Sequence, residues 1–112
     1  MLSKNLRMKS NTQFNYIFKN GKTLKNSKLL IFYSQNKTKT SKFGIVVSKK
    51  IGNSVTRNKI KRLIRESIRQ NINNFKNTYN YIFVARQGIE TLNFNQINEI
   101  LLKIINNSDV YV

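Results

Sequence analysis

The segment from Lys42 to Arg69, KFGIVVSKKIGNSVTRNKIKRLIRESIR, joins a strand pattern to a helical one and constrains the fold more than any other part of the chain. Its first residues are a compact run of strand formers, and Gly52 marks a tight turn after them. Asn53 or Ser54 is placed to cap a helix that we expect to run from Val55 to about Asn73. A strand that leads into a long helix predicts a mixed fold in which that helix packs on a sheet.

Helical phasing at about 100° per residue divides this helix into two faces. One arc is apolar and suited to a core, and it contains Ile60, Leu63, Ile64 and Ile68. The opposite arc is roughly 140° wide and has no acid, because Glu66 falls outside it. A solvated face normally mixes both signs of charge, so an acid-free arc indicates contact with an anionic partner. The residues of this arc are Arg57, Asn58, Lys61, Arg62, Arg65 and Arg69.

The rest of the sequence predicts one domain, residues 1–112, of class α+β. Ser10 and Gln13 match a capping box that starts a first helix, and Gly21 is placed to end it. We expect a single-domain α/β sandwich of order α-β-β-(β)-α-β-α. Its expected elements are helix Asn11–Asn20, antiparallel strands Leu29–Ser34 and Lys42–Lys49, strand Tyr79–Arg86, a short edge strand within Gly21–Ser27, and helix Phe94–Asn106 capped by Asn93.

Charge indicates the kind of partner that the chain would attract. Its 21 Lys and Arg against 4 Asp and Glu give a net charge of +17, which draws in polyanions, nucleic acid first. Hydrophobic residues make up 39% of the chain, which argues for a folded core. No N-terminal signal pattern and no apolar run of about 18 residues occurs, so we expect a soluble, cytoplasmic protein with no membrane partner.

Catalytic chemistry is hard to build from this composition. The sequence has no His and no Cys, which removes the usual general base and the thiol nucleophile. The acids Glu66, Glu90, Glu99 and Asp109 are scattered and lack the clustering of a two-metal site. The glycines are isolated, so no phosphate-binding loop is present. We therefore expect no catalytic residue, metal ligand, bound cofactor or small-molecule substrate in this chain.

Aromatic residues offer a second means of nucleic-acid contact. Phe14 and Phe18 lie one turn apart on the first expected helix, and Phe32 and Tyr33 lie on a strand. Such rings hold single-stranded nucleic acid by base stacking worth roughly 1–3 kcal/mol per base. Rings on strands and amphipathic helices are more often core residues, and composition alone favours the core for each of these.

The segment Ser48–Glu66, SKKIGNSVTRNKIKRLIRE, resembles the protein subunit of bacterial ribonuclease P. The hallmark of that family is an RNxxKRxxR helix after a strand that ends in SKK and a glycine turn. LRMKSNTQFNYIFKNG resembles the family's first helix, and YIFVARQG resembles its strand after the central helix. The resemblance implies a left-handed strand–helix–strand crossover, where general rules favour a right-handed one. The motif positions here are Arg57, Asn58, Lys61, Arg62 and Arg65.

The resemblance also implies a function. In the family the protein joins a large catalytic RNA, and the holoenzyme removes the 5′ leader of precursor tRNA at an active site in the RNA that requires Mg²⁺. The chain would thus be a noncatalytic subunit of an endoribonuclease. The implied leader cleft, between the first helix and the sheet, holds Phe14, Phe18, Phe32 and Tyr33. The implied contacts with the catalytic RNA are Lys49, Lys50, Arg57, Asn58, Lys61, Arg62, Arg65 and Arg69.

Other functions stay open from the residues alone. A structural RNA-binding protein, for example one associated with the ribosome, would use the same charge and rings. A small DNA-binding regulator would need a dimer surface, and no second exposed apolar stripe is evident for one. A basic amphipathic helix can also bind anionic membranes, but this apolar face lacks the usual bulky insertion residues.

Overall fold

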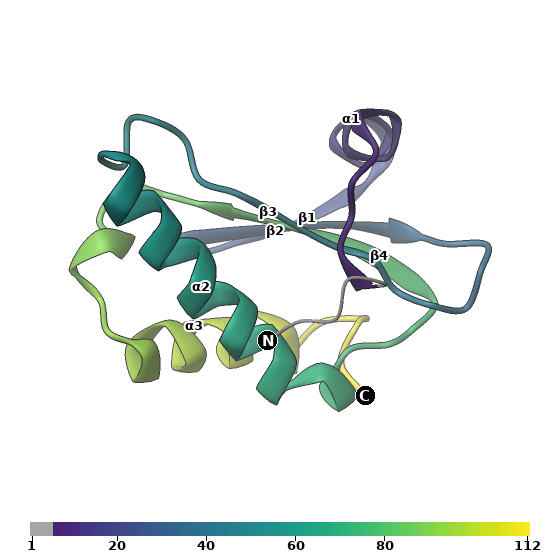
Figure 1. The fold of residues 1–112 in the computed structure, drawn as a ribbon. Coiled ribbons are helices and arrows are strands. Elements are labelled where there is room, and N and C mark those ends of the chain that lie inside the picture. The colour runs from purple at the N-terminus through teal and green to yellow at the C-terminus, as the bar shows by residue number, and fades with distance from the viewer. Residues whose placement is uncertain (1–5) are drawn as a thin grey trace.

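The computed structural model describes residues 6–112, which form a mixed α+β fold (Figure 1). The first and last helices have the expected bounds, and the short edge strand is present. The central helix ends before Asn73 and is followed by a 3-10 turn, and the third strand is shorter than Lys42–Lys49. The elements in order are α1 Asn11–Asn20, β1 Lys22–Lys25, β2 Leu29–Gln35, β3 Phe43–Val46, α2 Ser54–Gln70, η2 Ile72–Asn74, β4 Tyr79–Ala85, η3 Ile89–Thr91 and α3 Phe94–Asn106.

The strands form one open sheet in the order β1-β2-β4-β3. β2 pairs antiparallel with β1 and β4, whereas β3 pairs parallel with β4. β2 and β3 therefore run in opposite directions, as expected, but they are not neighbours because β4 lies between them. α2 connects β3 to β4 and makes the expected strand–helix–strand crossover, whose left hand stays an expectation from the family resemblance.

The sheet separates two layers of helices. Figure 1 shows α1 on one face of the sheet, and α2 with α3 on the other. Along β2, Ile31 and Tyr33 are buried in the larger core, which includes residues of α2 and α3. Phe32 between them points to the α1 side, where it packs against a smaller cluster that contains Met8 and Ile17. One face of the sheet is thus well covered, and the other is covered only in part.

α1 meets the sheet through a close backbone contact at Gly21. A Cβ at this position would lie 2.6 Å from the Ile17 carbonyl oxygen and 2.7 Å from the Tyr33 carbonyl oxygen. Gly21 ends the helix as expected, but its backbone is extended, so the reason is the space between two carbonyls and not a left-handed conformation. At the other end Ser10 Oγ accepts from the Gln13 amide at 3.4 Å, and no return bond from the Gln13 side chain occurs within the described residues.

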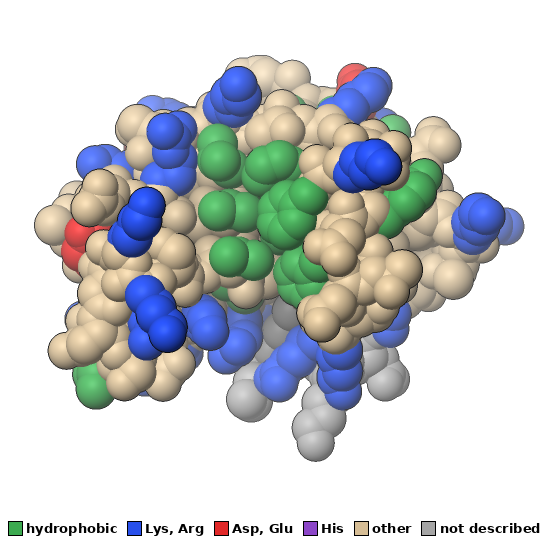
Figure 2. Space-filling view, turned by 90° about the horizontal axis from the view of Figure 1, so that it is seen from above, with side chains coloured by type: hydrophobic (Ala, Val, Ile, Leu, Met, Phe, Trp, Pro, Cys, Tyr) green, Lys and Arg blue, Asp and Glu red, His purple; other side chains and the backbone are tan. Residues whose placement is uncertain are grey.

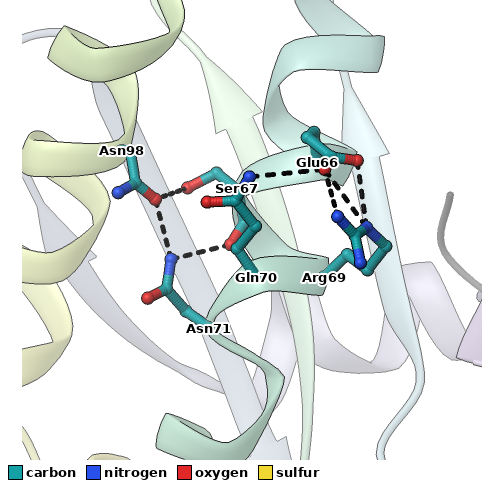
Figure 3. Close-up of polar contacts among 6 residues, drawn as sticks. All are labelled: Glu66, Ser67, Arg69, Gln70, Asn71 and Asn98. Carbon is teal, nitrogen blue, oxygen red and sulfur yellow. Dashed lines mark hydrogen bonds and ion pairs between the residues drawn. The ribbon is translucent and has the colours of Figure 1, made fainter.

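A buried polar link joins α2 to α3 (Figure 3). Ser67 is fully buried, and its Oγ donates to Asn98 Oδ1 at 2.7 Å. Asn71 Nδ2 donates to the same oxygen at 2.7 Å and to the Ser67 carbonyl at 2.8 Å. The core cluster around these residues is apolar, so the link supplies directional contacts that set the position of one helix along the other.

Replacing Asn98 with Ala is expected to destabilise the protein by about 1–3 kcal/mol, because the buried Ser67 hydroxyl loses its acceptor. Asn95→Ala, at an exposed position of the same helix, is the matched control and should change stability by less than about 0.5 kcal/mol. Urea unfolding followed by circular dichroism measures both variants. An Asn98→Ala variant as stable as the wild type would show that the link adds nothing to the free energy of folding.

Candidate nucleic-acid interface

The basic face of α2 points away from the core, as the helical phasing predicts. Ile60, Ile64 and Ile68 are at most 2% exposed and fix the helix with its other side outward. Every predicted donor on that side is exposed or half-buried, and Lys49 and Lys50 are exposed in the turn before the helix. The basic face is defined as Arg57, Asn58, Lys61, Arg62 and Arg65.

The turn before α2 is tied to the first turn of the helix. Asn53 Oδ1 accepts from the Thr56 amide at 2.9 Å, so Asn53 is the N-cap. Arg57 Nε donates to the Gly52 carbonyl at 3.2 Å. Arg57 therefore has a structural contact as well as a place on the basic face, and it helps to position the turn that carries the two lysines.

Arg69 forms an ion pair within its own helix (Figure 3). Its Nε donates to the two carboxylate oxygens of Glu66 at 3.1 and 3.2 Å, and its Nη2 makes a short contact with one of them. Hydrogen bonds from Arg69 lower the pKa of the Glu66 carboxyl from 4.5 to about 2, so the pair is charged at neutral pH. Phasing placed Glu66 outside the arc, yet the two long side chains meet. Arg69 consequently offers an anion less net charge than the residues of the basic face.

Three phenylalanines form a partly exposed cluster between α1 and the sheet. Phe18 is 41% exposed and meets Phe32 edge to face, with 5.0 Å between ring centroids. The Phe14 ring lies 6.4 Å from the Phe18 ring and packs over Gly44 of β3, where a Cβ would come within 2.6 Å of it. Glycine at position 44 therefore gives Phe14 its place on the sheet. Phe14, Phe18 and Phe32, three of the predicted cleft residues, are called the phenylalanine cluster below.

Tyr33 is the predicted cleft residue that lies elsewhere. Its side chain belongs to the larger core, 4% exposed, and its ring meets that of Tyr79 edge to face at 5.4 Å. Neighbouring residues of a strand point to opposite faces of the sheet, so the rings of Phe32 and Tyr33 cannot both line the α1 side. The assignment of Tyr33 to the cleft is therefore wrong.

Aliphatic side chains extend the phenylalanine cluster across the sheet. Leu30 of β2 and Val46 of β3 both pair in register with Val84 of β4, and all three are half-buried on the α1 side. Figure 2 shows this face as a patch of hydrophobic side chains with Lys and Arg around it. These aliphatic residues are not among the residues expected from the sequence, although alternation along each strand is the signal that identifies them.

Acidic side chains do not gather into a metal-binding group in residues 6–112. No three His, Cys, Asp or Glu side chains come together there. Glu99 pairs with Lys103 at 3.7 Å, and Asp109 pairs with Lys22 at 4.0 Å. Over the same residues, none of the helices has the length and apolar character needed to cross a membrane.

A basic helix face and an apolar aromatic face on one small α+β domain have the chemistry of a nucleic-acid-binding protein. A sequence profile described as Ribonuclease P matches residues 2–109. The ribonuclease P protein component of Clostridium novyi (strain NT) is 38% identical over 112 residues, which cover 98% of this chain and 99% of that protein. The chain belongs to the ribonuclease P protein family.

Solved structures agree with this assignment. The RNase P protein of Staphylococcus aureus superposes with a TM-score of 0.88 at 33% identity, covering 96% of this chain and 98% of that one. The RNase P protein of Thermotoga maritima superposes with a TM-score of 0.84 at 29% identity, covering 92% of this chain and 97% of that one. These likenesses confirm the α+β class and the order of elements expected from the sequence.

Glu66→Gln is expected to steepen the salt dependence of binding to a single-stranded ribo-oligonucleotide, because it releases Arg69 beside the basic face. One added phosphate contact changes the slope by about 0.7 for a single strand. Glu99→Gln releases Lys103 on α3 in the same way and is the matched control, for which we expect a smaller change. Anisotropy titrations at several salt concentrations give the slopes. Equal slopes for the two variants would show that the location of the released cation does not matter.

Proposed function

We propose that this chain is the noncatalytic protein subunit of ribonuclease P, which binds the catalytic RNA and the 5′ leader of precursor tRNA and so assists endonucleolytic removal of the leader. The observation that carries the proposal is the basic face of α2, where the family's motif residues share one outward side of a helix. Membership of the ribonuclease P protein family supports it.

The basic face would bind phosphates of the catalytic RNA. From Arg57 to Arg65 the helix rises about 12 Å, so its cationic groups reach more than one phosphate. Arginine binds phosphate through two parallel hydrogen bonds, and Asn58 adds a donor and an acceptor for a base or a sugar. Lys49 and Lys50 extend the same surface from the turn before the helix.

The α1 side of the sheet would hold the leader. The phenylalanine cluster and the aliphatic side chains beside it form an apolar face on which unpaired bases can stack. Stacking on an aromatic ring is possible for every base, so such a face could bind leaders of different sequence. The Lys and Arg side chains around the patch would lie near the phosphates of the strand.

Hydrolysis would be performed by the RNA. The sequence has neither His nor Cys, and its four acids lie apart in the sequence. The Mg²⁺ ions of the reaction would be held by RNA phosphates, which are ligands that Mg²⁺ favours. The cations of the protein would strengthen the complex at low Mg²⁺, because they offset repulsion between the phosphates of two RNAs.

Reconstitution with a bacterial ribonuclease P RNA tests the proposal. At low Mg²⁺ the protein should raise the rate of precursor tRNA cleavage. Arg62→Gln and Arg65→Gln should weaken assembly and flatten its salt dependence by about 0.7–0.9 per lost phosphate contact. Lys103→Gln removes one positive charge from α3, outside the basic face, and is the matched control. Folded protein that gives no stimulation would overturn the proposal, and crosslinking to ribosomal RNA alone in cells would favour a ribosome-associated protein.

Phe18→Ala should weaken binding of leader-bearing precursor tRNA by about 5-fold or more and leave mature tRNA unaffected, because one stacked base is worth roughly 1–3 kcal/mol. Phe18 is a cleaner probe than Phe14, which also packs on Gly44. Phe18→Tyr keeps the ring and should retain binding, whereas Phe18→Leu keeps only the apolar bulk. Equal losses on both tRNAs would assign Phe18 to the fold instead of the leader.

A further inference from the structure

The flank of α1 opposite the phenylalanine cluster carries a second groove. Phasing at about 100° per residue puts Thr12, Gln13 and Tyr16 on this flank. Two adjoining hollows of about 350 and 250 Å³ lie along it, and both have Tyr16, Ser34 and Gln35 in their walls. No residue of the phenylalanine cluster lines either hollow. The two hollows together are called the Tyr16 groove.

The walls of the Tyr16 groove differ in chemistry from the apolar face. The Tyr16 side chain is 57% exposed, so its ring is accessible to a ligand. Gln13 is exposed, and Ser34 is half-buried on the side of β2 that faces α1. Neither the Gln13 side-chain amide nor the Ser34 hydroxyl makes a hydrogen bond within residues 6–112. The amide and the hydroxyl both provide a donor and an acceptor, which are the groups needed to read the edge of a base. An aromatic ring beside these two polar groups suits a planar polar ligand.

Positive charge lies at one end of the groove. Lys37 and Lys42 line the larger hollow. The loop that carries Lys37 is held by Asn36, whose side-chain amide donates to one backbone carbonyl at 2.9 Å and accepts from one backbone amide at 3.1 Å. At the smaller hollow, Lys22 is paired with Asp109 at 4.0 Å. An anionic group of a ligand would favour the larger hollow, because two lysines line it and one lines the smaller hollow.

We propose that the Tyr16 groove binds an unpaired nucleotide of single-stranded RNA. The base stacks on Tyr16, its edge faces Gln13 and Ser34, and its phosphate lies at Lys37 and Lys42. The volume of the larger hollow, about 350 Å³, is in the range of small-ligand sites. α1 then separates two RNA sites, one apolar and tolerant of any base, the other polar and able to select a base. The inference rests on the proposed function only in taking RNA as the partner.

Binding of short oligo(A), oligo(C) and oligo(U) to the full chain, measured by anisotropy, tests the proposal. Tyr16→Ala should weaken binding by about 5-fold or more, the lower limit for loss of one stacked base. Tyr16→Phe keeps the ring and should bind like the wild type. Tyr16 is exposed, so neither substitution removes a core side chain. Phe18→Ala is the matched variant on the other flank of α1.

The outcomes separate the two RNA sites. If Tyr16→Ala binds like the wild type while Phe18→Ala does not, the Tyr16 groove is not an RNA site and the leader cleft stands. If the reverse holds, the leader cleft fails and the Tyr16 groove stands. Losses that multiply in the double variant show two independently bound bases and support both sites. A loss in Tyr16→Phe equal to that in Tyr16→Ala overturns the proposal, because stacking is then not the cause.

Base selection tests the polar wall separately. The wild type should distinguish the three oligonucleotides, and the Gln13→Ala, Ser34→Ala double variant should bind them with nearly equal affinity, because hydrogen bonds to base edges are lost. A preference that survives both substitutions would overturn the assigned role of these two side chains.

Discussion

Burial of the isoleucines of α2 is the interaction on which the rest of the structure depends. Each pair of like charges at i, i+4 spacing on the basic face destabilises the helix by about 0.2–0.5 kcal/mol. A fully buried isoleucine side chain contributes roughly 1.5–3 kcal/mol, so Ile60, Ile64 and Ile68 together outweigh that repulsion several-fold. Packing of α2 on the sheet fixes which side of the helix faces outward. The motif residues are therefore exposed together on one surface.

The local elements could be predicted from the sequence, but the order of the strands could not. Helix ends depend on short windows, as at Asn93 and Gln96, which form a complete capping box at the start of α3. The place of β4 between β2 and β3 depends instead on contacts between distant residues, such as Phe43 in register with Tyr81. The sequence shows only a polar stretch between β2 and β3, and that stretch is compatible with either order.

The outward side of α2 could be predicted because phasing depends only on helix geometry. The local contacts of its long side chains could not be predicted in this way. Arg69 pairs with Glu66, and Arg57 donates to the Gly52 carbonyl. The contact of Phe14 with Gly44 could not be predicted either, because it joins two elements that are far apart in the sequence. Tyr33 is a different case, since alternation beside Phe32 already places the two rings on opposite faces.

α1 is held to the sheet at both of its ends. The Met8 amide donates to the Phe43 carbonyl at 2.9 Å on one side, and Gly21 lies against the backbone of β2 on the other. A helix of 10 residues is marginal alone, so these attachments and the buried Ile17 set its position. The walls on both flanks of α1 are therefore in place before a ligand arrives. In the proposed complexes the loss of conformational entropy on binding would fall on the RNA strand, and the stiffness of that strand would be a determinant of affinity.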